Sequence, residues 1–282
     1  MPPRFASVLD VQPRSIGRNF SALSLELEPL GEHVSPIVVL DDFTVSAPIF
    51  GPHPHAGFSA VTYVLEDSPG ALRNRDSLGN EIIMAPGGIV WTQAGSGMLH
   101  EELPAQAGHP VHGLQIFVNV KSKNKFEPPR VHTLDASRVP EWGSADATRV
   151  RVVVGAFGGI ASPLVPIEPF NLLDVQLKND WSFNLPRDHN ALLYVLKGGV
   201  TARAAGRDQL VGSQQALAIE GAGHVTIAAV HPSHFVLLSA AAIREPMVVH
   251  GPFIMNEPSQ VEAAMMRYRS GAMGRLAPHV ET

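Results

Sequence analysis

The sequences GPHPHAGF (residues 51–58) and GSGMLHEE (residues 95–102) each hold two side chains of the types that bind metal ions. Within each pair the two residues are two positions apart. The four residues are His53, His55, His100 and Glu102. Side chains at positions i and i+2 of a β-strand point to the same face of the strand. Two such strands lying side by side would aim three imidazoles and one carboxylate at a common point.

This set of donors is compatible with several metals. Imidazole and carboxylate ligands without thiolate suit iron(II), manganese, nickel, copper or zinc. A closed structural zinc site would use four tetrahedral ligands, whereas an octahedral site with the same residues keeps two positions open. Glu102 could bind the metal throughout or act as a general base toward a bound hydroxyl group. The strand alternation places Glu101 on the opposite face, where we expect a surface carboxylate.

The residues around these motifs predict an all-β scaffold. Gly (25) and Pro (24) are frequent, and short apolar or alternating runs lie between them. Such a pattern is typical of antiparallel barrels or sandwiches. The strands expected in the first half lie at residues 23–30, 37–40, 58–66, 72–78 (followed by a tight turn at 79–80), 81–84, 89–94, 98–102 and 114–120. We expect Asp41, Asp42 and Phe43 to begin a loop, and Trp91, Gln93 and Met98 to line a pocket or fill the core.

The second half resembles the first in the order of its strands and turns. A proline-containing connection at residues 126–143 separates the halves, and we place the domain boundary between residues 1–136 and 137–282. The pattern Tyr-Val-Leu followed by a charged residue occurs at 63–66 and again at 194–197, which indicates a weak internal duplication. The chain ends in a predicted docking helix with Asn256 as its N-cap and Gly271 as its stop. Its apolar face consists of Val261, Ala264, Met265 and Tyr268.

Composition narrows the classes of partner. The net charge of -5 gives no basic surface for nucleic acid, and the lysines at 121, 123 and 125 are predicted to form a solvated turn. The absence of cysteine excludes disulfides and thiolate sites. No signal peptide or membrane helix is recognisable, so we expect a soluble cytoplasmic protein. The histidines at 109, 112, 189, 224, 231 and 234 lack a ligand-like spacing, and Arg73, Arg75 and Asp76 are expected in surface ion pairs.

These motifs together resemble the pirin family of the cupin superfamily. The resemblance rests on HPH-x-GF at 53–58, VTY at 61–63, RDSLGN at 75–80, PG at 86–87, W-x-x-AG-x-G at 91–97 and LH-x-E at 99–102. Near the C-terminus it rests on REP at 244–246, HGPF at 250–253 and MN at 255–256. The resemblance covers nearly the whole chain.

The resemblance implies a bicupin, in which two β-barrels face each other and a short C-terminal helix follows. It implies that the N-terminal cupin domain binds iron (Fe²⁺) through His53, His55, His100 and Glu102, and that the C-terminal domain lacks metal ligands. In agreement, Asp188-His189-Asn190 contains no His-x-His motif. One residue departs from the family pattern, because Ser59 stands where many pirins carry glutamate.

The resemblance implies two kinds of function. Some bacterial pirins are quercetinases, which open the ring of the flavonol quercetin with dioxygen, and here Glu102 would assist deprotonation of the substrate. Other pirins act through protein partners in a way that depends on metal or redox state. A purely structural metal is the third interpretation. We therefore expect a monomer that binds a small aromatic substrate or a protein partner, and neither a membrane nor nucleic acid directly.

Overall fold

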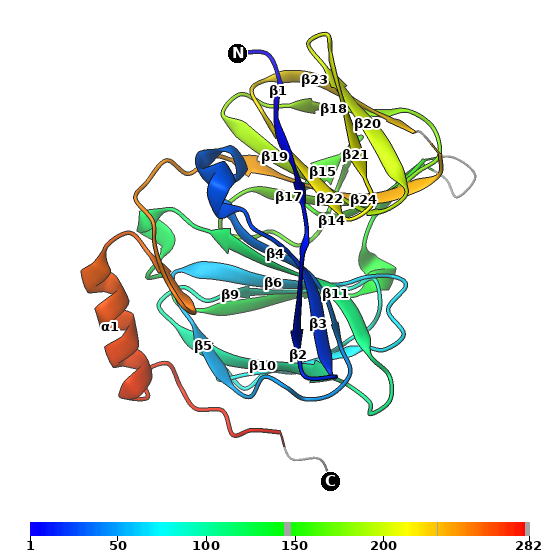
Figure 1. Cartoon of the computed structure of the whole chain (residues 1–282). Coiled ribbons are helices and arrows are strands. Elements are labelled where there is room, and N and C mark those ends of the chain that lie inside the picture. The colour runs from blue at the N-terminus through cyan, green and yellow to red at the C-terminus, as the bar shows by residue number, and fades with distance from the viewer. Residues whose placement is uncertain (144–147, 230, 280–282) are drawn as a thin grey trace.

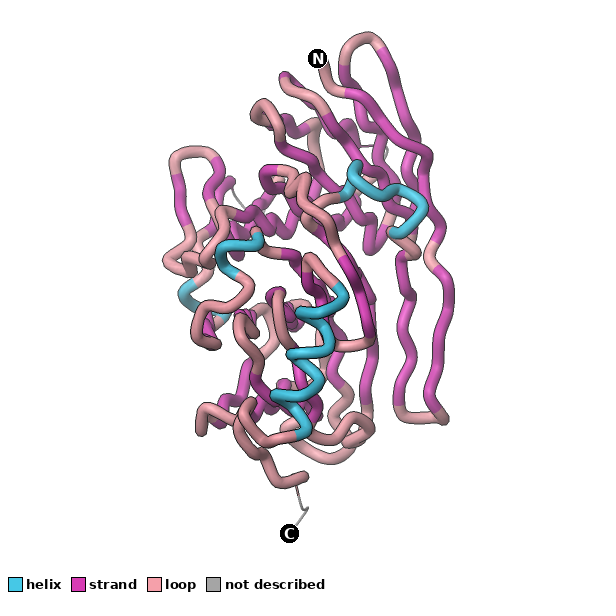
Figure 2. Tube along the Cα trace, turned by 90° about the vertical axis from the view of Figure 1, so that its left-hand side faces the viewer, coloured by secondary structure: helices cyan, strands magenta, loops and turns pink. Residues whose placement is uncertain are grey.

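Two β-barrels lie one above the other in the computed structural model, which describes residues 1–143, 148–229 and 231–279. Figure 1 shows the barrel formed mainly by the first half of the chain below and the second barrel above it. Strands dominate both barrels, and the described helices are short (Figure 2). The predicted all-β architecture of two facing barrels with a C-terminal helix is confirmed.

The first barrel consists of a seven-stranded and a four-stranded antiparallel sheet. The larger sheet contains, in spatial order, β12 (Arg130–Leu134), β9 (Ile89–Gln93), β6 (Phe58–Val64), β11 (Val111–Asn119), β4 (Ile37–Val45), β3 (Phe20–Leu25) and β2 (Gln12–Ile16). The smaller sheet contains β5 (His53–His55), β10 (Met98–Pro104), β7 (Leu72–Asp76) and β8 (Glu81–Met84). Three 3-10 helices lie in its connections: η1 (Glu28–Val34), η2 (Ser122–Asn124) and η3 (Ala136–Arg138).

The second barrel repeats this arrangement of seven and four strands. Its larger sheet contains β1 (Arg4–Asp10), β22 (Gln215–Glu220), β19 (His189–Lys197), β24 (Ser233–Ala241), β17 (Phe170–Leu177), β14 (Arg149–Val154) and β13 (Glu141–Gly143). Its smaller sheet contains β18 (Trp181–Leu185), β23 (Gly223–Ala229), β20 (Gly199–Ala204) and β21 (Arg207–Gly212). The remaining elements are β15 (Ala156–Phe157), β16 (Ile160–Ala161), β25 (Val248–His250), β26 (Phe253–Met255) and α1 (Pro258–Arg269).

The two ends of the chain cross over between the barrels. Strand β1 pairs with β22 and so extends the large sheet of the second barrel. Conversely, α1 packs on the first barrel, where its Val261 and Ala264 join a buried cluster with Leu99 of β10. The domain boundary between residues 136 and 137 remains a prediction. In the structure, each terminal segment packs on the barrel formed mainly by the other half of the chain.

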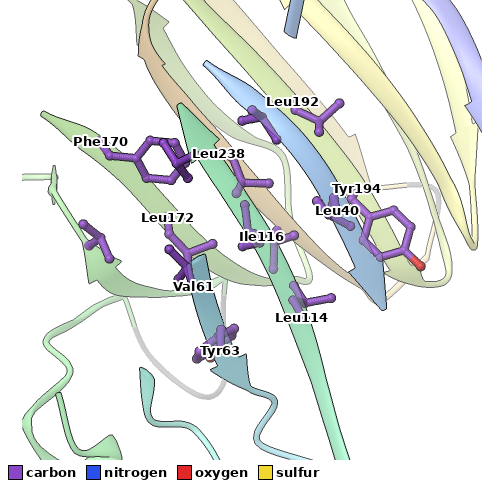
Figure 3. Close-up of a cluster of buried hydrophobic side chains, with 14 of the residues drawn as sticks. Leu40, Val61, Tyr63, Leu114, Ile116, Phe170, Leu172, Leu192, Tyr194 and Leu238 are labelled. Carbon is purple, nitrogen blue, oxygen red and sulfur yellow. The ribbon is translucent and has the colours of Figure 1, made fainter. Parts of the chain in front are cut away.

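The largest hydrophobic core lies between the barrels. The two seven-stranded sheets face each other, and side chains from both fill the space between them (Figure 3). The first barrel contributes Leu40, Val61 and Ile116, and the second contributes Leu172 and Leu238. All five are at most 1% exposed. Because burial of apolar area drives association, this core holds the barrels together as one body.

Several sequence predictions need local correction. The strand expected over residues 23–30 ends at Leu25, and Pro29 lies in η1, where its missing N–H does not interrupt a sheet ladder. The loop expected at Asp41–Phe43 is wrong, because β4 continues to Val45. Helix α1 begins at Pro258 with Glu257 as N-cap, one residue later than predicted, while Gly271 (φ 78°) follows its end as predicted.

Lys125 is buried, so the predicted solvated lysine turn is wrong at this position. Its side chain is 0% exposed. Its ammonium group donates to the carbonyl oxygens of Gly57 (2.8 Å) and Ile254 (2.9 Å) and to Oδ1 of Asn119 (2.6 Å). A buried ammonium group is tolerated only where such acceptors surround it. Lys125 thereby joins the start of β6 to β26 near the other end of the chain.

Among the described residues, no helix has the length and apolar character needed to cross a membrane.

Candidate metal centre

Three histidines from two paired strands meet at one point in the first barrel. Strand β5 pairs with β10 so that His53 lies opposite His100. Nε2 of His53 is 3.1 Å from Nε2 of His100, and one ring nitrogen from each of His53, His55 and His100 lies within 4.8 Å of the others. Two nitrogens bound to one metal at about 2.1 Å and roughly 90° would lie about 3 Å apart. The predicted convergence of the three imidazoles is therefore observed.

The turn that follows His55 requires glycine. Gly57 has φ 84°, a left-handed conformation that side-chain-bearing residues rarely adopt. A Cβ atom at this position would lie 2.1 Å from the carbonyl oxygen of Ile254. The glycine thus lets the C-terminal segment approach closely behind the two ligand-type histidines of β5.

Burial keeps these imidazoles neutral. It lowers the pKa of His55 to about 3, with the neighbouring His53 as a further cause. It also lowers the pKa of His53 and of His100. Neutral imidazole is the form that offers a lone pair to a metal. The three residues are therefore ready to act as ligands at neutral pH.

The hydrogen bonds of the rings also fit a metal. Nδ1 of His53 lies 3.0 Å from the Gly51 carbonyl oxygen, which assigns the proton to Nδ1 and leaves Nε2 free to bind. Nδ1 of His100 is buried and has no hydrogen-bond partner among the described residues. Buried unsatisfied polar atoms are costly and call for an explanation. The nitrogen of His100 that faces His53 is Nε2, at 3.1 Å, so it is the pair of Nε2 atoms that fits a shared metal, and the unpaired Nδ1 of His100 is not explained by it.

Glu102 faces the same cavity but is held by another residue. The hydroxyl of Thr62 donates to its carboxylate, with oxygen–oxygen distances of 2.7 and 2.8 Å. Burial raises the pKa of Glu102 to about 7, and the bond from Thr62 partly counteracts this effect. The carboxylate is absent from the group of mutually close ligand atoms. Its role as fourth ligand stays a prediction.

An aromatic cavity of about 180 Å³ adjoins the histidines. Its apolar wall consists mainly of Phe20, Phe43, Phe50 and Phe117. Its polar groups include His53, His55, Glu102, Gln115 and Asp41. Burial raises the pKa of Asp41, while the Ser24 hydroxyl and the Arg14 charge counteract it. The cavity is suited to an aromatic molecule that carries polar substituents.

Ser59, which departs from the family pattern, does not face this cavity. Thr62 lies on the same strand and points to Glu102 inside the barrel, and residues separated by three positions lie on opposite faces. The odd separation places Ser59 on the opposite face of β6, toward the side where Val61 and Tyr63 join the core between the barrels. A glutamate is therefore not needed here to complete the group of three histidines.

Glu101 is buried, which corrects the expected surface position. It does lie on the face opposite His100 and Glu102, but it is only 3% exposed. Arg75 donates to its carboxylate at 2.7 Å, and the backbone N–H of His279 donates to it at 3.2 Å. The C-terminal tail therefore covers the back of β10. Sequence spacing does not reveal such a distant partner.

The nearby charged residues divide into two groups. Arg73 and Arg75 form ion pairs with Glu81 and Glu101, respectively. Asp76 is instead 2% exposed and accepts hydrogen bonds from the backbone N–H groups of Leu78 and Asn80 in the β7–β8 turn. Trp91, Gln93 and Met98 are buried, and Trp91 stacks edge-on against Phe170 between the barrels. Core packing accounts for that tryptophan.

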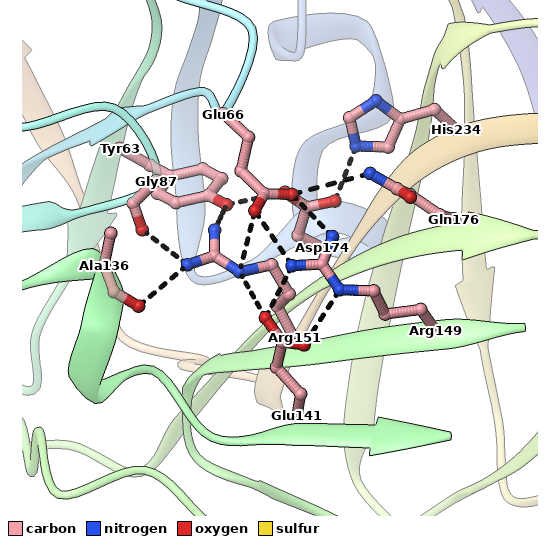
Figure 4. Close-up of polar contacts among 10 residues, drawn as sticks. All are labelled: Tyr63, Glu66, Gly87, Ala136, Glu141, Arg149, Arg151, Asp174, Gln176 and His234. Carbon is pink, nitrogen blue, oxygen red and sulfur yellow. Dashed lines mark hydrogen bonds and ion pairs between the residues drawn. The ribbon is translucent and has the colours of Figure 1, made fainter. Parts of the chain in front are cut away.

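Two polar networks at the barrel interface were not predicted. Tyr63 of the first barrel donates to Asp174 of the second at 2.6 Å, and Asp174 also contacts His234 at 2.5 Å (Figure 4). Tyr194 of the second barrel donates to Asp42 of the first at 2.9 Å. Asp42 in turn contacts His112, also at 2.9 Å. Tyr63 and Tyr194 occupy matching positions in the repeated Tyr-Val-Leu pattern, and this repeat is the one feature of the sequence that points to these two networks.

Two arginines of β14 reinforce this interface. Arg151 is 2% exposed and donates to the Tyr63 hydroxyl at 2.7 Å and to the Gly87 carbonyl oxygen at 2.9 Å. Arg149 binds both carboxylate oxygens of Glu66 at 2.9 Å (Figure 4). Bidentate arginine–carboxylate pairs fix geometry as well as charge. The barrels are therefore held in register by polar contacts as well as by the apolar core.

Comparison with known proteins agrees with this architecture. The profile described as Pirin matches residues 26–118, and that described as Pirin C-terminal cupin domain matches residues 172–274. The chain belongs to the pirin family. A Pseudomonas aeruginosa protein whose name proposes a quercetin 2,3-dioxygenase is 30% identical, over 96% of this chain and 99% of that protein. Human pirin is 31% identical over 93% and 87% of the two chains.

Solved structures share the pirin fold. The crystal structure of a quercetin 2,3-dioxygenase from Acinetobacter baumannii has a TM-score of 0.85 at 24% identity and covers 98% of this chain and 99% of that one. The Escherichia coli pirin YhhW in complex with nickel(II) has a TM-score of 0.65 at 20% identity, with coverage of 84% and 99%. A metal is thus found in a pirin of this fold, and this chain brings three histidines together.

Proposed function

We propose that this pirin is an iron-dependent dioxygenase of the quercetin 2,3-dioxygenase type. The observation that carries the proposal is a cluster of three neutral histidines beside an aromatic cavity that also contains a carboxylate of raised pKa. In the proposed reaction both atoms of dioxygen enter the organic product, the flavonol ring opens, and one ring carbon leaves as carbon monoxide. The identity to a relative named for this activity supports the assignment.

Bound iron would lower the pKa of a substrate hydroxyl group and supply the redox chemistry with dioxygen. The nitrogens of His53, His55 and His100 would hold it. Glu102 would accept the proton of the hydroxyl group, because it faces the same cavity and has a pKa near neutrality. Thr62 orients this carboxylate by its hydrogen bond.

The aromatic wall would position the substrate ring. Phe20 and Phe50 meet edge to face at 5.1 Å beside the cavity, and Phe50 is 39% exposed. The cavity volume of about 180 Å³ is below the roughly 300–1,000 Å³ of sites for drug-sized ligands. A single-ring phenol would fit with little movement, whereas a flavonol would require Phe50 to move outward.

The test is oxygen uptake by iron(II)-loaded protein with quercetin, combined with detection of carbon monoxide. His109→Ala is a matched control, because His109 is exposed and its ring forms a hydrogen bond only with the carbonyl oxygen of Ala107 among the described residues. We expect uptake by the wild type and by His109→Ala, and none by His100→Ala. Wild-type protein with confirmed bound iron that consumes no oxygen would refute the proposal for quercetin.

A second candidate is a regulatory protein whose metal state alters a surface bound by a partner. It is favoured by the contact of the C-terminal tail with Glu101, which lies between two candidate ligands on β10. A shift of β10 on metal binding or oxidation would move Glu101 and so displace the C-terminal tail that contacts it. Capture of a partner by only one of the apo, ferrous and ferric forms would support this function, and equal capture by all three would reject the switch.

A further inference from the structure

A second cavity, of about 440 Å³, lies in the cleft between the barrels. Residues of β2, β3, β4 and β11 line it from the first barrel, and residues of β19 and β24 line it from the second. It does not share a lining residue with the cavity beside the three histidines. The cleft is therefore a separate candidate site, and its interpretation does not depend on the proposed dioxygenase function.

Aspartates contact two histidines in the cleft wall and raise the pKa of each. His112 places Nε2 2.9 Å from Asp42 and Nδ1 2.9 Å from Asp67. These contacts raise its pKa, with the hydrogen bond to Asp42 as the largest cause. For His234, burial lowers the pKa, but the bond to Asp174 and the nearby carboxylates outweigh burial and raise it.

The cleft has more basic than acidic groups in its wall. Arg14, Lys197, His112 and His234 line it, against Asp42 and Asp67. With histidine counted as neutral, as it is in the chain's net charge of -5, the arginine, the lysine and the two aspartates sum to 2 - 2 = 0, and protonation of the two histidines adds positive charge. Both oxygens of Asp42 are occupied, one by His112 and the other by Tyr194. The acidic groups are thus largely committed to protein contacts.

Three basic groups remain able to contact a ligand. Neither Arg14 nor Lys197 forms an ion pair with any residue that the structure describes, and both side chains are exposed at the cleft. His234 uses Nε2 for Asp174, and its Nδ1 has no hydrogen-bond partner among the described residues. Leu23, Leu65 and Leu196 supply an apolar part of the wall. The surroundings suit a small molecule with negative ends and a hydrocarbon middle.

We propose that the cleft between the barrels binds a small organic dicarboxylate, with its carboxylates on Arg14, Lys197 and His234 and its carbon chain against the leucines. Two carboxylates match the separate basic groups contributed by the two barrels, and charge-assisted hydrogen bonds to arginine and lysine are stronger than neutral ones. The ligand would bridge both domains.

Isothermal titration calorimetry of the full-length protein with glutarate tests this assignment at pH 6.5 and constant ionic strength, because salt screens exposed charges. We expect one glutarate per chain. Arg14→Met and Lys197→Met should each weaken binding about tenfold. Lys123→Met is the matched control, since Lys123 is exposed, lies in η2 and does not line the cleft. Butyrate, with a single carboxylate, should bind about tenfold more weakly than glutarate.

Several outcomes would overturn the proposal. Absence of glutarate binding at millimolar concentration would refute the site. Equal loss of affinity in Lys123→Met and Lys197→Met would show that the anion associates with the surface in general. Inorganic phosphate binding as tightly as glutarate would refute the assignment to a ligand with a carbon chain. Unchanged melting temperatures of the exposed-residue variants would confirm that any loss of binding is local.

Discussion

Replacement of Lys125 by methionine tests whether a buried cation fastens the C-terminal segment behind the histidine cluster. The wild-type ammonium group donates three hydrogen bonds, to Gly57, Asn119 and Ile254. Methionine has a similar length but leaves three buried acceptors without a donor. At about 2 kcal/mol each, this costs about 6 kcal/mol. The cation itself opposes folding, because burial lowers the pKa of Lys125 from 10.5 to about 8.

That lowered pKa corresponds to about 3 kcal/mol of stability lost at neutral pH in the wild type. Lys125→Met has no buried cation and so does not bear this cost. Its free energy of unfolding should therefore be lower than that of the wild type by about 6 minus about 3, or about 3 kcal/mol, at pH 7. Between pH 8 and 10.5 the amine of Lys125 is protonated in the unfolded chain and largely neutral in the folded chain, so the unfolded state binds more protons than the folded state. Wild-type stability should therefore rise with pH relative to Lys125→Met, and the difference between them should grow by about 1 kcal/mol from pH 7 to pH 9.

Urea unfolding of both proteins at pH 7 and pH 9 measures this difference, with Lys123→Met as an exposed lysine control. A Lys125→Met protein as stable as the wild type would show that the three acceptors find other donors. A difference that stays constant between the two pH values would show that the buried amine does not titrate in this range. Either result would refute the reasoning from burial.

Three further expectations concern the metal centre and the interface. His100→Ala should reduce bound iron from about one per chain to below one tenth, measured by elemental analysis after iron(II) loading, because loss of one of three imidazoles removes a principal donor; undiminished iron would place the site elsewhere. Tyr63→Phe should cost about 2 kcal/mol in urea unfolding and Tyr194→Phe about 1 kcal/mol, because the Tyr63 phenol also accepts a bond from a buried arginine; equal costs would contradict this ranking. Folding raises the pKa values of His112 and His234, so their contribution to the free energy of unfolding is complete below about pH 6.5 and is lost as the pH rises through the folded pKa values. In urea unfolding across this range, the double variant His112→Gln, His234→Gln should lack this part of the pH dependence.

The cluster of three histidines was predictable because its arrangement is set by short-range rules. Period-two alternation fixes the common face of His53 and His55, and it separates Glu101 from His100 and Glu102. Pairing of the two strands then brings the imidazoles together. The bond from Thr62 to Glu102 was not predictable from such rules, because it joins residues 40 positions apart.

The buried charges escaped prediction for a related reason. A lysine or glutamate is assigned to the surface because burial of an unpaired charge is unfavourable. At Lys125 and Glu101 the compensating groups come from the C-terminal segment, which includes Ile254 and His279. Only the folded chain places that segment beside them. The repeated tyrosine pattern marked corresponding strands in the two barrels, but it did not predict that His112 and His234 lie in strands and contact aspartates there.

Strand β4 connects the two cavities through adjacent aspartates. Asp41 lines the aromatic cavity and Asp42 lines the cleft between the barrels, as the alternation of a strand requires. Arg14 lines the cleft, yet its charge also acts on Asp41 and lowers that pKa against the effect of burial. A dicarboxylate bound to Arg14 would neutralise part of this charge and raise the pKa of Asp41. Occupation of the cleft would thereby change the electrostatics of the aromatic cavity without any movement of the barrels.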